Sequence, residues 1–147
     1  MINLYTIGFS KKTAKDFFNI LKDAEIRKII DVRRNNVSQL AGFTKKKDLE
    51  YFLQIHNIEY THNLDFAPTQ EILKDYQKKI ISWEQYEVRY TDLIVKNKSI
   101  SQHSHSYFNQ SCLLCSESTP EYCHRRILAE LIKINSKFTN EVNILHL

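Results

Sequence analysis

The chain has 147 residues, 42% of them hydrophobic, which fits one domain with a buried core and leaves too little for two ordinary domains. No run approaches the roughly 18 consecutive apolar residues of a membrane span, and the first residues lack the regions of a signal peptide. We therefore expect a cytoplasmic protein without a membrane helix, whose net charge of +4 allows a modest attraction to phosphates.

The first half of the chain alternates between strand and helix patterns. Residues 2–7 predict a strand that ends at Gly8, and Thr13 can cap a helix whose apolar residues follow helical spacing. Residues 26–33 form a β-branched run typical of a central strand, and after a loop a helix is predicted around residues 49–53. These patterns indicate two successive strand-helix units.

The second half continues the alternation. Residues 58–62 predict a third strand, and helical periodicity follows over residues 69–79 and 82–97. The polar segment 99–110 fits either a short helix or a long loop. A fourth strand, a helix and a last strand are predicted over residues 111–115, 120–134 and 141–147.

This order of elements predicts an α/β fold, with one domain over residues 1–147 and a mostly parallel sheet of about five strands covered by helices on both faces. Ligands of such sheets bind beyond the carboxyl ends of the strands. The candidate positions are therefore Gly8 to Ser10, Asp31 to Arg33, and Cys115 to Glu117.

The three cysteines lie within twelve residues, and their odd number favours reduced thiols over a disulfide framework. Their spacing of three places Cys112 and Cys115 on opposite faces of a regular strand, so Cys112 is expected in the core. A metal site with Cys112, Cys115, Cys123 and His124 as its four ligands is therefore disfavoured. A smaller site built from Cys115, Cys123 and a histidine is less constrained.

The stretch before Cys123 contains signals for a helix start. Ser118 or Thr119 is a suitable cap and Pro120 a suitable first helical residue. A thiol in the first turn, close to Arg125, would have its thiolate favoured, and the free N–H groups there can hold an anion. The alternative is that Cys123 is a small buried hydrophobic residue, which we favour for this cysteine in isolation.

Two charged residues alternate at the end of the second predicted strand. Arg33, followed by Arg34, can clamp a carboxylate or phosphate, or Asp31 and Arg33 can balance each other beside the core. Glu117 fits a proton carrier, a hydrogen-bond partner or a solvated loop residue.

Four stretches together resemble the domain-of-unknown-function family 488. They are "TIGFS" at 6–10, "DVRRNNVS" at 31–38, "IEY" at 58–60 and "LLCSESTPEYCHR" at 113–125. The resemblance extends to about Leu131. It departs at Val37, where the family often has proline, and at "DFAP", where the family has a Leu-Gly pair.

The resemblance implies a small prokaryotic α/β protein whose motif residues gather at one edge of the sheet, in a family without an agreed biochemical function. The matching positions in this sequence are Gly8, Ser10, Asp31, Arg33, Ser38, Cys115, Glu117, Cys123, His124 and Arg125.

Our leading hypothesis is an enzyme-like domain that binds an anionic, phosphate- or nucleotide-like ligand at the carboxyl edge of the sheet. Arg33 and Arg125 would hold the anion, assisted by Gly8, Ser10, Asp31 and Ser38. Nucleophilic or acid-base work would fall to Cys115, Glu117, Cys123 and His124.

Two further classes of function remain open. The net charge and the run Lys45 to Lys47 suit a nucleic-acid-binding module without catalysis, whereas Cys115 and Cys123 suit a metal or redox protein. A purely structural role is the fourth reading, in which Arg33 and Arg125 satisfy Asp31, Glu117 and backbone carbonyls. The reaction, the cofactor and the oligomeric state are not determined by the sequence.

Overall fold

The computed structural model describes residues 1–37, 42–139 and 141–147, and these form an α/β fold around one sheet. The strands are β1 (Ile2–Gly8), β2 (Lys28–Asp31), β3 (Glu59–His62), β4 (Ser111–Cys115) and β5 (Val142–His146). Their order is β3-β2-β4-β1-β5, and every neighbouring pair is parallel. The predicted fold class is thus confirmed.

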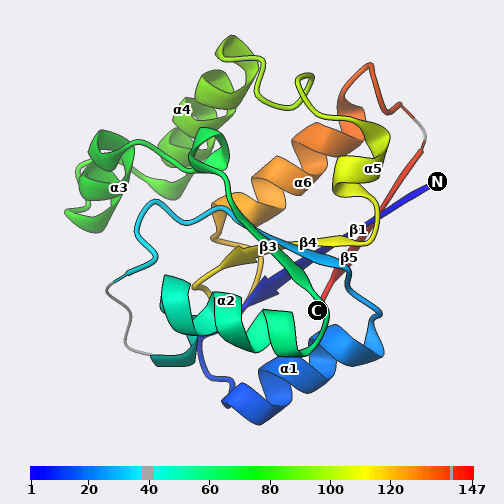
Figure 1. Ribbon diagram of the computed structural model, residues 1–147. Helices are drawn as coiled ribbons and strands as arrows, with labels where there is room; N and C mark the ends of the chain where they lie inside the picture. The colour runs from blue at the N-terminus through cyan, green and yellow to red at the C-terminus, as the bar shows by residue number, and fades with distance from the viewer. Residues whose placement is uncertain (38–41, 140) are drawn as a thin grey trace.

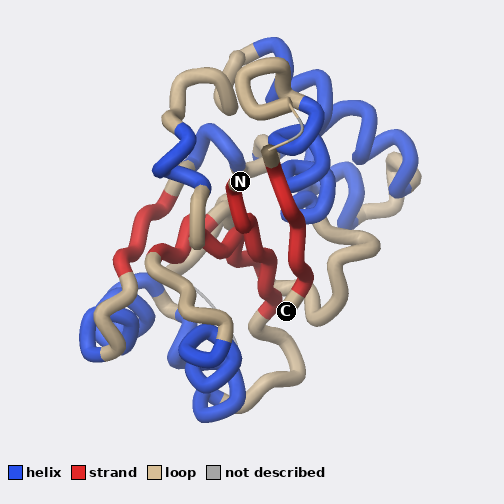
Figure 2. Tube along the Cα trace, turned by 90° about the vertical axis from the view of Figure 1, so that its right-hand side faces the viewer, coloured by secondary structure: helices blue, strands red, loops and turns tan. Residues whose placement is uncertain are grey.

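Helices cover both faces of the sheet (Figures 1 and 2). One face packs against α1 (Ala14–Asp23) and α2 (Lys46–Ile55), and the other packs against α3 (Gln70–Gln77), α4 (Trp83–Lys96), α5 (His105–Phe108) and α6 (His124–Ile134). Two short 3₁₀ turns, η1 (Gly42–Thr44) and η2 (Leu64–Phe66), complete the described elements. Among the described residues, no helix has the length and apolar character needed to cross a membrane.

Alternation along the buried strands separates two apolar cores. In β4, Leu113 and Cys115 belong to the core under α3, α4, α5 and α6, whereas Cys112 and Leu114 belong to the core under α1 and α2. Successive side chains of a strand point to opposite faces, which accounts for this division. The predicted separation of Cys112 from Cys115 is therefore confirmed.

Side-chain caps begin the helices where the sequence predicts them. The Thr13 and Thr69 side chains accept hydrogen bonds from the amides of Asp16 and Ile72, which lie in the first turns of α1 and α3. Ser82 and Gln85 form a reciprocal capping box at the start of α4. Each cap satisfies amides that have no partner inside the helix.

The prediction that a helix begins at Pro120 is wrong. Helix α6 begins at His124, and Cys123 is its extended N-cap residue, with φ −136° and ψ 138°. Residues 120–122 form a turn that is closed by the Cys123 amide donating to the Pro120 carbonyl oxygen at 3.2 Å. The cap signals of Ser118 and Thr119 are local preferences, and long-range contacts of the preceding loop override them.

Three other predicted segments also differ in detail from the structure. Strands β2 and β3 are shorter than the predicted runs and begin at Lys28 and Glu59. The segment left open between a helix and a loop contains the short helix α5, whose Phe108 is fully buried.

Candidate functional site

The candidate site lies where β1 and β4 end side by side. Gly8 pairs with Cys115 in the parallel register, and the Ser10 amide donates to the Ser116 carbonyl oxygen at 3.0 Å. The chain leaves β1 for α1 on one face of the sheet and leaves β4 for α6 on the other. Diverging connections of this kind open a crevice at the carboxyl edge of a parallel sheet.

Gly8 and Arg125 together fix the loop that follows β4. A Cβ atom at Gly8 would lie 1.5 Å from the Glu117 carbonyl oxygen, so only glycine allows this close approach. The same oxygen accepts a hydrogen bond from Arg125 Nη1 at 2.7 Å, and the Arg125 side chain is almost fully buried. The buried Arg125 side chain therefore fixes the position of the loop through this hydrogen bond.

This loop brings together three metal-ligating side chains, which we call the donor trio: Cys115 at the end of β4, Cys123 at the N-cap of α6, and His124 in its first turn. One donor atom from each of the three lies within 4.8 Å of the others. Cys115 Sγ is 3.7 Å from His124 Nδ1, and all three residues are buried. Cys112 lies on the other face of the sheet and takes no part.

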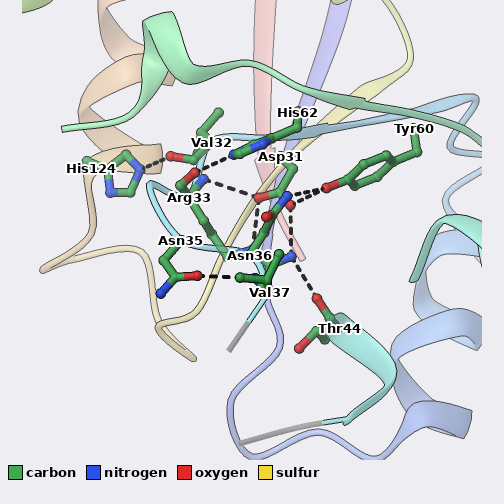
Figure 3. Close-up of polar contacts among 10 residues, drawn as sticks. All are labelled: Asp31, Val32, Arg33, Asn35, Asn36, Val37, Thr44, Tyr60, His62 and His124. Atoms are coloured by element: carbon green, nitrogen blue, oxygen red, sulfur yellow. Dashed lines mark hydrogen bonds and ion pairs between the residues drawn. The ribbon is translucent and has the colours of Figure 1, made fainter. Parts of the chain in front are cut away.

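A backbone contact sets the orientation of the His124 ring. His124 Nε2 lies 2.7 Å from the Val32 carbonyl oxygen (Figure 3). A carbonyl only accepts hydrogen bonds, so Nε2 carries a proton and Nδ1 is the atom that faces Cys115. Fixing one ring nitrogen in this way is how proteins orient a metal-binding histidine.

The three groups also shift one another's protonation. The hydrogen bond from Cys123 lowers the pKa of Cys115 well below its ordinary value, and the nearby His124 lowers it further, although burial opposes both effects. Burial and the negative Cys115 raise the pKa of Cys123. Burial opposes a charge on His124, but attraction to Cys115 outweighs it and raises the pKa of His124. Negative charge in the trio is therefore concentrated on Cys115.

Asp31 and Arg33 form a buried ion pair next to the trio. Arg33 Nε and Nη2 each donate to one carboxylate oxygen of Asp31 at 2.8 Å, and Nη2 also donates to the Thr44 carbonyl oxygen. The Tyr60 hydroxyl donates to Asp31 Oδ2 at 2.6 Å and accepts from Asn36 (Figure 3). Most of the donor capacity of Arg33 is thus used within the protein.

Val32 connects this ion pair to the donor trio. The pair holds the backbone on either side of Val32, and His62 Nε2 donates to the Arg33 carbonyl oxygen at 2.7 Å. The Val32 carbonyl oxygen then accepts from His124, so the "DVR" motif supports the histidine of the "CHR" motif.

Two small hollows adjoin the trio, each with a volume of about 170 Å³. The aromatic hollow is walled by Tyr76, Trp83, Tyr86 and Tyr122, with Glu117 and all three trio residues also lining it. The arginine hollow is lined by Arg33, Arg34, Asn35 and Pro68. Leu73, Gln77, Cys115, Ser116 and His124 line both hollows, so two members of the trio, Cys115 and His124, lie at their junction.

The predicted site residues thus fall into distinct surroundings. Cys115, Cys123 and His124 come together, Gly8 and Arg125 shape the loop beside them, and Glu117 is exposed at the aromatic hollow. Asp31 and Arg33 pair with each other, and Ser10 contributes its amide to the β1–β4 edge. Ser38 lies outside the described residues.

The sequence did not single out the Val32 carbonyl as a site group, nor Trp83 and Tyr122 as parts of a pocket wall. Arg34 enters the sequence interpretation only as the neighbour of Arg33 in an anion clamp, and in the structure it lines the arginine hollow. Val32 acts only through its carbonyl, which any residue would supply, so no side-chain signal marks it. The aromatic residues follow or flank helical apolar stripes and look like core residues until the topology places α4 over the end of β4.

A family model described as "Domain of unknown function DUF488" matches residues 13–132. This span includes the Asp31–Arg33 pair and the donor trio, whereas Gly8 and Ser10 precede it. No curated protein and no solved structure matches the chain.

Proposed function

The chain belongs to the DUF488 family, a domain of unknown function, and within that family we propose that it is a metal-dependent enzyme whose ion is held by Cys115, Cys123 and His124. The observation that carries this proposal is the approach of two thiol sulfurs and one imidazole nitrogen to within 4.8 Å of one another in a buried position. The family itself assigns no reaction, so the chemistry rests on the trio.

The donor set suits zinc or a similar divalent transition metal. Two thiolates and an imidazole are ligands that zinc prefers, with Zn–S near 2.3 Å and Zn–N near 2.0–2.1 Å. A tetrahedral ion with those bond lengths places sulfur and nitrogen about 3.6 Å apart. The distance of 3.7 Å between Cys115 Sγ and His124 Nδ1 supports such an ion.

Three protein ligands leave the fourth position of a tetrahedral ion free, which is the pattern of catalytic zinc sites, whereas structural sites use four ligands. The aromatic hollow lies against the trio and gives that position access to a small molecule. An ion there would activate a water molecule for hydrolysis. The water oxygen would bond to the electrophilic atom, the bond to the leaving group would break, and Glu117 would carry the water proton to the leaving group.

The contacts of the arginines refine the hypothesis of an anionic ligand. Arg33 is occupied by Asp31 and Thr44, and Arg125 holds the Glu117 carbonyl, so both fit a positioning role. Arg33 and Arg34 both line the arginine hollow, but Arg33 is buried and Arg34 is only half-buried. In this proposal the anion therefore meets Arg34 and the remaining Nη1 of Arg33, while the other contacts of Arg33 and those of Arg125 keep the loops in place.

The test is metal content. Wild-type protein reconstituted with Zn²⁺ and passed through a desalting column should retain about one ion per chain by elemental mass spectrometry. With Co²⁺ instead, it should show the intense visible bands of tetrahedral thiolate coordination. Cys115→Ser and Cys123→Ser should each lose most of the bound metal.

Cys112→Ala is the matched control, because it removes a buried cysteine from the same strand but from the opposite face of the sheet. It should retain the full metal content. Equal metal retention by Cys115→Ser and Cys112→Ala, or a wild-type protein that retains no ion, would refute the proposed function.

A further inference from the structure

The two hollows are neighbours, because five residues line both of them, including Cys115 and His124 of the donor trio. Cys115, Ser116 and His124 line both, and Leu73 and Gln77 extend the shared boundary toward α3. A molecule bound against the trio therefore reaches an aromatic wall on one side and an arginine on the other. The ligand must accordingly have two chemically different ends.

The size of each hollow limits what fits. About 170 Å³ is roughly the space of five or six liquid water molecules, which is below the usual volume of a pocket for a drug-sized ligand. Each hollow therefore accommodates one small group, such as a single ring system or a phosphate.

The aromatic hollow suits a flat ring. Trp83 and Tyr86 are stacked with ring centroids 4.9 Å apart, and Tyr122 meets Trp83 edge-on. Aromatic faces and edges of this kind bind another ring in stacked or edge-to-face geometry. Gln77 and Glu117 provide hydrogen-bonding groups at the margin of the hollow, which suits a ring with polar edges.

The arginine hollow suits an anion. Arg34 Nε donates to the Pro68 carbonyl oxygen at 2.8 Å, and in the described part of the chain no hydrogen bond or ion pair uses its two Nη atoms. Arg33 lines the same hollow, and its buried Nη1 has no hydrogen-bond partner among the described residues. Guanidinium groups with unused donors bind phosphate through charge-assisted hydrogen bonds.

Resting on the proposed function, we infer that the substrate class is a nucleoside monophosphate, bound with the base in the aromatic hollow, the phosphate in the arginine hollow and the middle of the molecule beside the donor trio. Ring and phosphate are then recognised by separate walls. A substitution in one hollow therefore leaves the contacts of the other hollow intact.

The experiment is calorimetric titration of the zinc-loaded protein with uridine 5′-monophosphate, uridine, ribose 5-phosphate and inorganic phosphate. The nucleotide should bind at least about tenfold more tightly than any of the three fragments, because only it occupies both hollows.

Two variants separate the walls. Arg34→Gln should weaken binding of the nucleotide and ribose 5-phosphate about tenfold and leave uridine unchanged. Tyr122→Ala should weaken the nucleotide and uridine and leave phosphate unchanged. Arg27→Gln and Tyr51→Ala are the controls, since Arg27 is an exposed arginine at the opposite end of β2 and Tyr51 matches the 60% exposure of Tyr122.

The inference is overturned if the nucleotide binds no more tightly than phosphate, or if Arg34→Gln and Arg27→Gln have equal effects. Metal content measured on the same samples keeps the two proposals apart. Absent nucleotide binding with one zinc per chain refutes only the substrate class. Nucleotide binding by a wild-type protein that retains no zinc after reconstitution refutes only the metal centre.

Discussion

The carbonyl oxygen of Val32 accepts a hydrogen bond of 2.7 Å from His124 Nε2, and this contact joins two motifs that are 92 residues apart in the chain. It directs His124 Nδ1 toward Cys115 and makes the position of Val32 part of the candidate metal centre. The Asp31–Arg33 pair holds the backbone around Val32, so the ion pair supports the site.

Replacing Arg33 with methionine tests this supporting role. Asp31 is fully buried and would lose its charged partner, which in proteins costs about 3–5 kcal/mol of stability. We expect the free energy of unfolding in urea to fall by that order, together with weaker zinc retention because Val32 would shift. Arg27→Met removes an exposed arginine and should change neither quantity. A stable Arg33→Met protein with normal zinc content would contradict the role.

Gly8→Ala should disrupt the loop that carries the trio. The new Cβ atom would lie 1.5 Å from the Glu117 carbonyl oxygen, so the loop must move and release Arg125. We expect a loss of about 1–3 kcal/mol in the free energy of unfolding, and reduced zinc retention. Gly42→Ala is the matched control because, chain neighbours aside, no atom of the described residues lies within 4 Å of the Cβ position there. Equal unfolding free energies and equal zinc retention in the two variants would contradict this role of Gly8.

The arrangement of the cysteines was largely predictable from the sequence. Strand alternation separates Cys112 from Cys115, and the order of elements predicts that Gly8, Asp31 and Cys115 end at one edge of the sheet. The first expectation needs only the two-residue period of a strand, and the second needs only the order of the elements. The structure confirms both expectations.

Contacts that depend on backbone atoms or on distant segments were not predictable. Local cap residues favour a helix start at Pro120, whereas Cys123 is the true N-cap and Arg125 holds the loop before it. The sequence also left open whether Arg33 meets a ligand or Asp31. Periodicity gives the face on which a side chain lies, but the partner on that face comes from the tertiary structure.

Stability should decline at high pH, and Tyr60 should contribute to the decline. Burial and the neighbouring Asp31 raise the pKa of Tyr60 above its ordinary value near 10. Its contribution to the free energy of unfolding is therefore complete below pH 10, where the Tyr60 hydroxyl is neutral in both the folded and the unfolded state. The contribution is lost as the pH rises above 10, because the hydroxyl then ionises readily only in the unfolded state. Urea unfolding of wild type between pH 8 and 11, in roughly half-unit steps, should show this loss.

Tyr60→Phe separates this contribution from that of Tyr86 and Tyr90, whose pKa values are also raised by burial. The variant loses the hydroxyl contact with Asp31, so it should be about 1–2 kcal/mol less stable at neutral pH. Its stability should depend less steeply on pH above 10 than that of wild type. An unchanged slope would show that Tyr60 ionises equally in both states.

Metal removal should change which cysteines react with iodoacetamide. In the zinc-loaded protein the sulfurs of Cys115 and Cys123 would be bound to the ion, so little alkylation is expected. After chelation, Cys115 should react first, because the hydrogen bond from Cys123 and the nearby His124 lower its pKa and favour the reactive thiolate. Peptide mass spectrometry over time assigns the modified residue.

Cys112 is the internal control for that experiment, because burial raises its pKa and it lies in the opposite core. It should stay unmodified with or without metal and react only after unfolding in denaturant. Protection of Cys115 by zinc, with no effect on Cys112, would locate the ion at the donor trio. Equal alkylation rates of Cys115 with and without zinc would place any bound ion elsewhere.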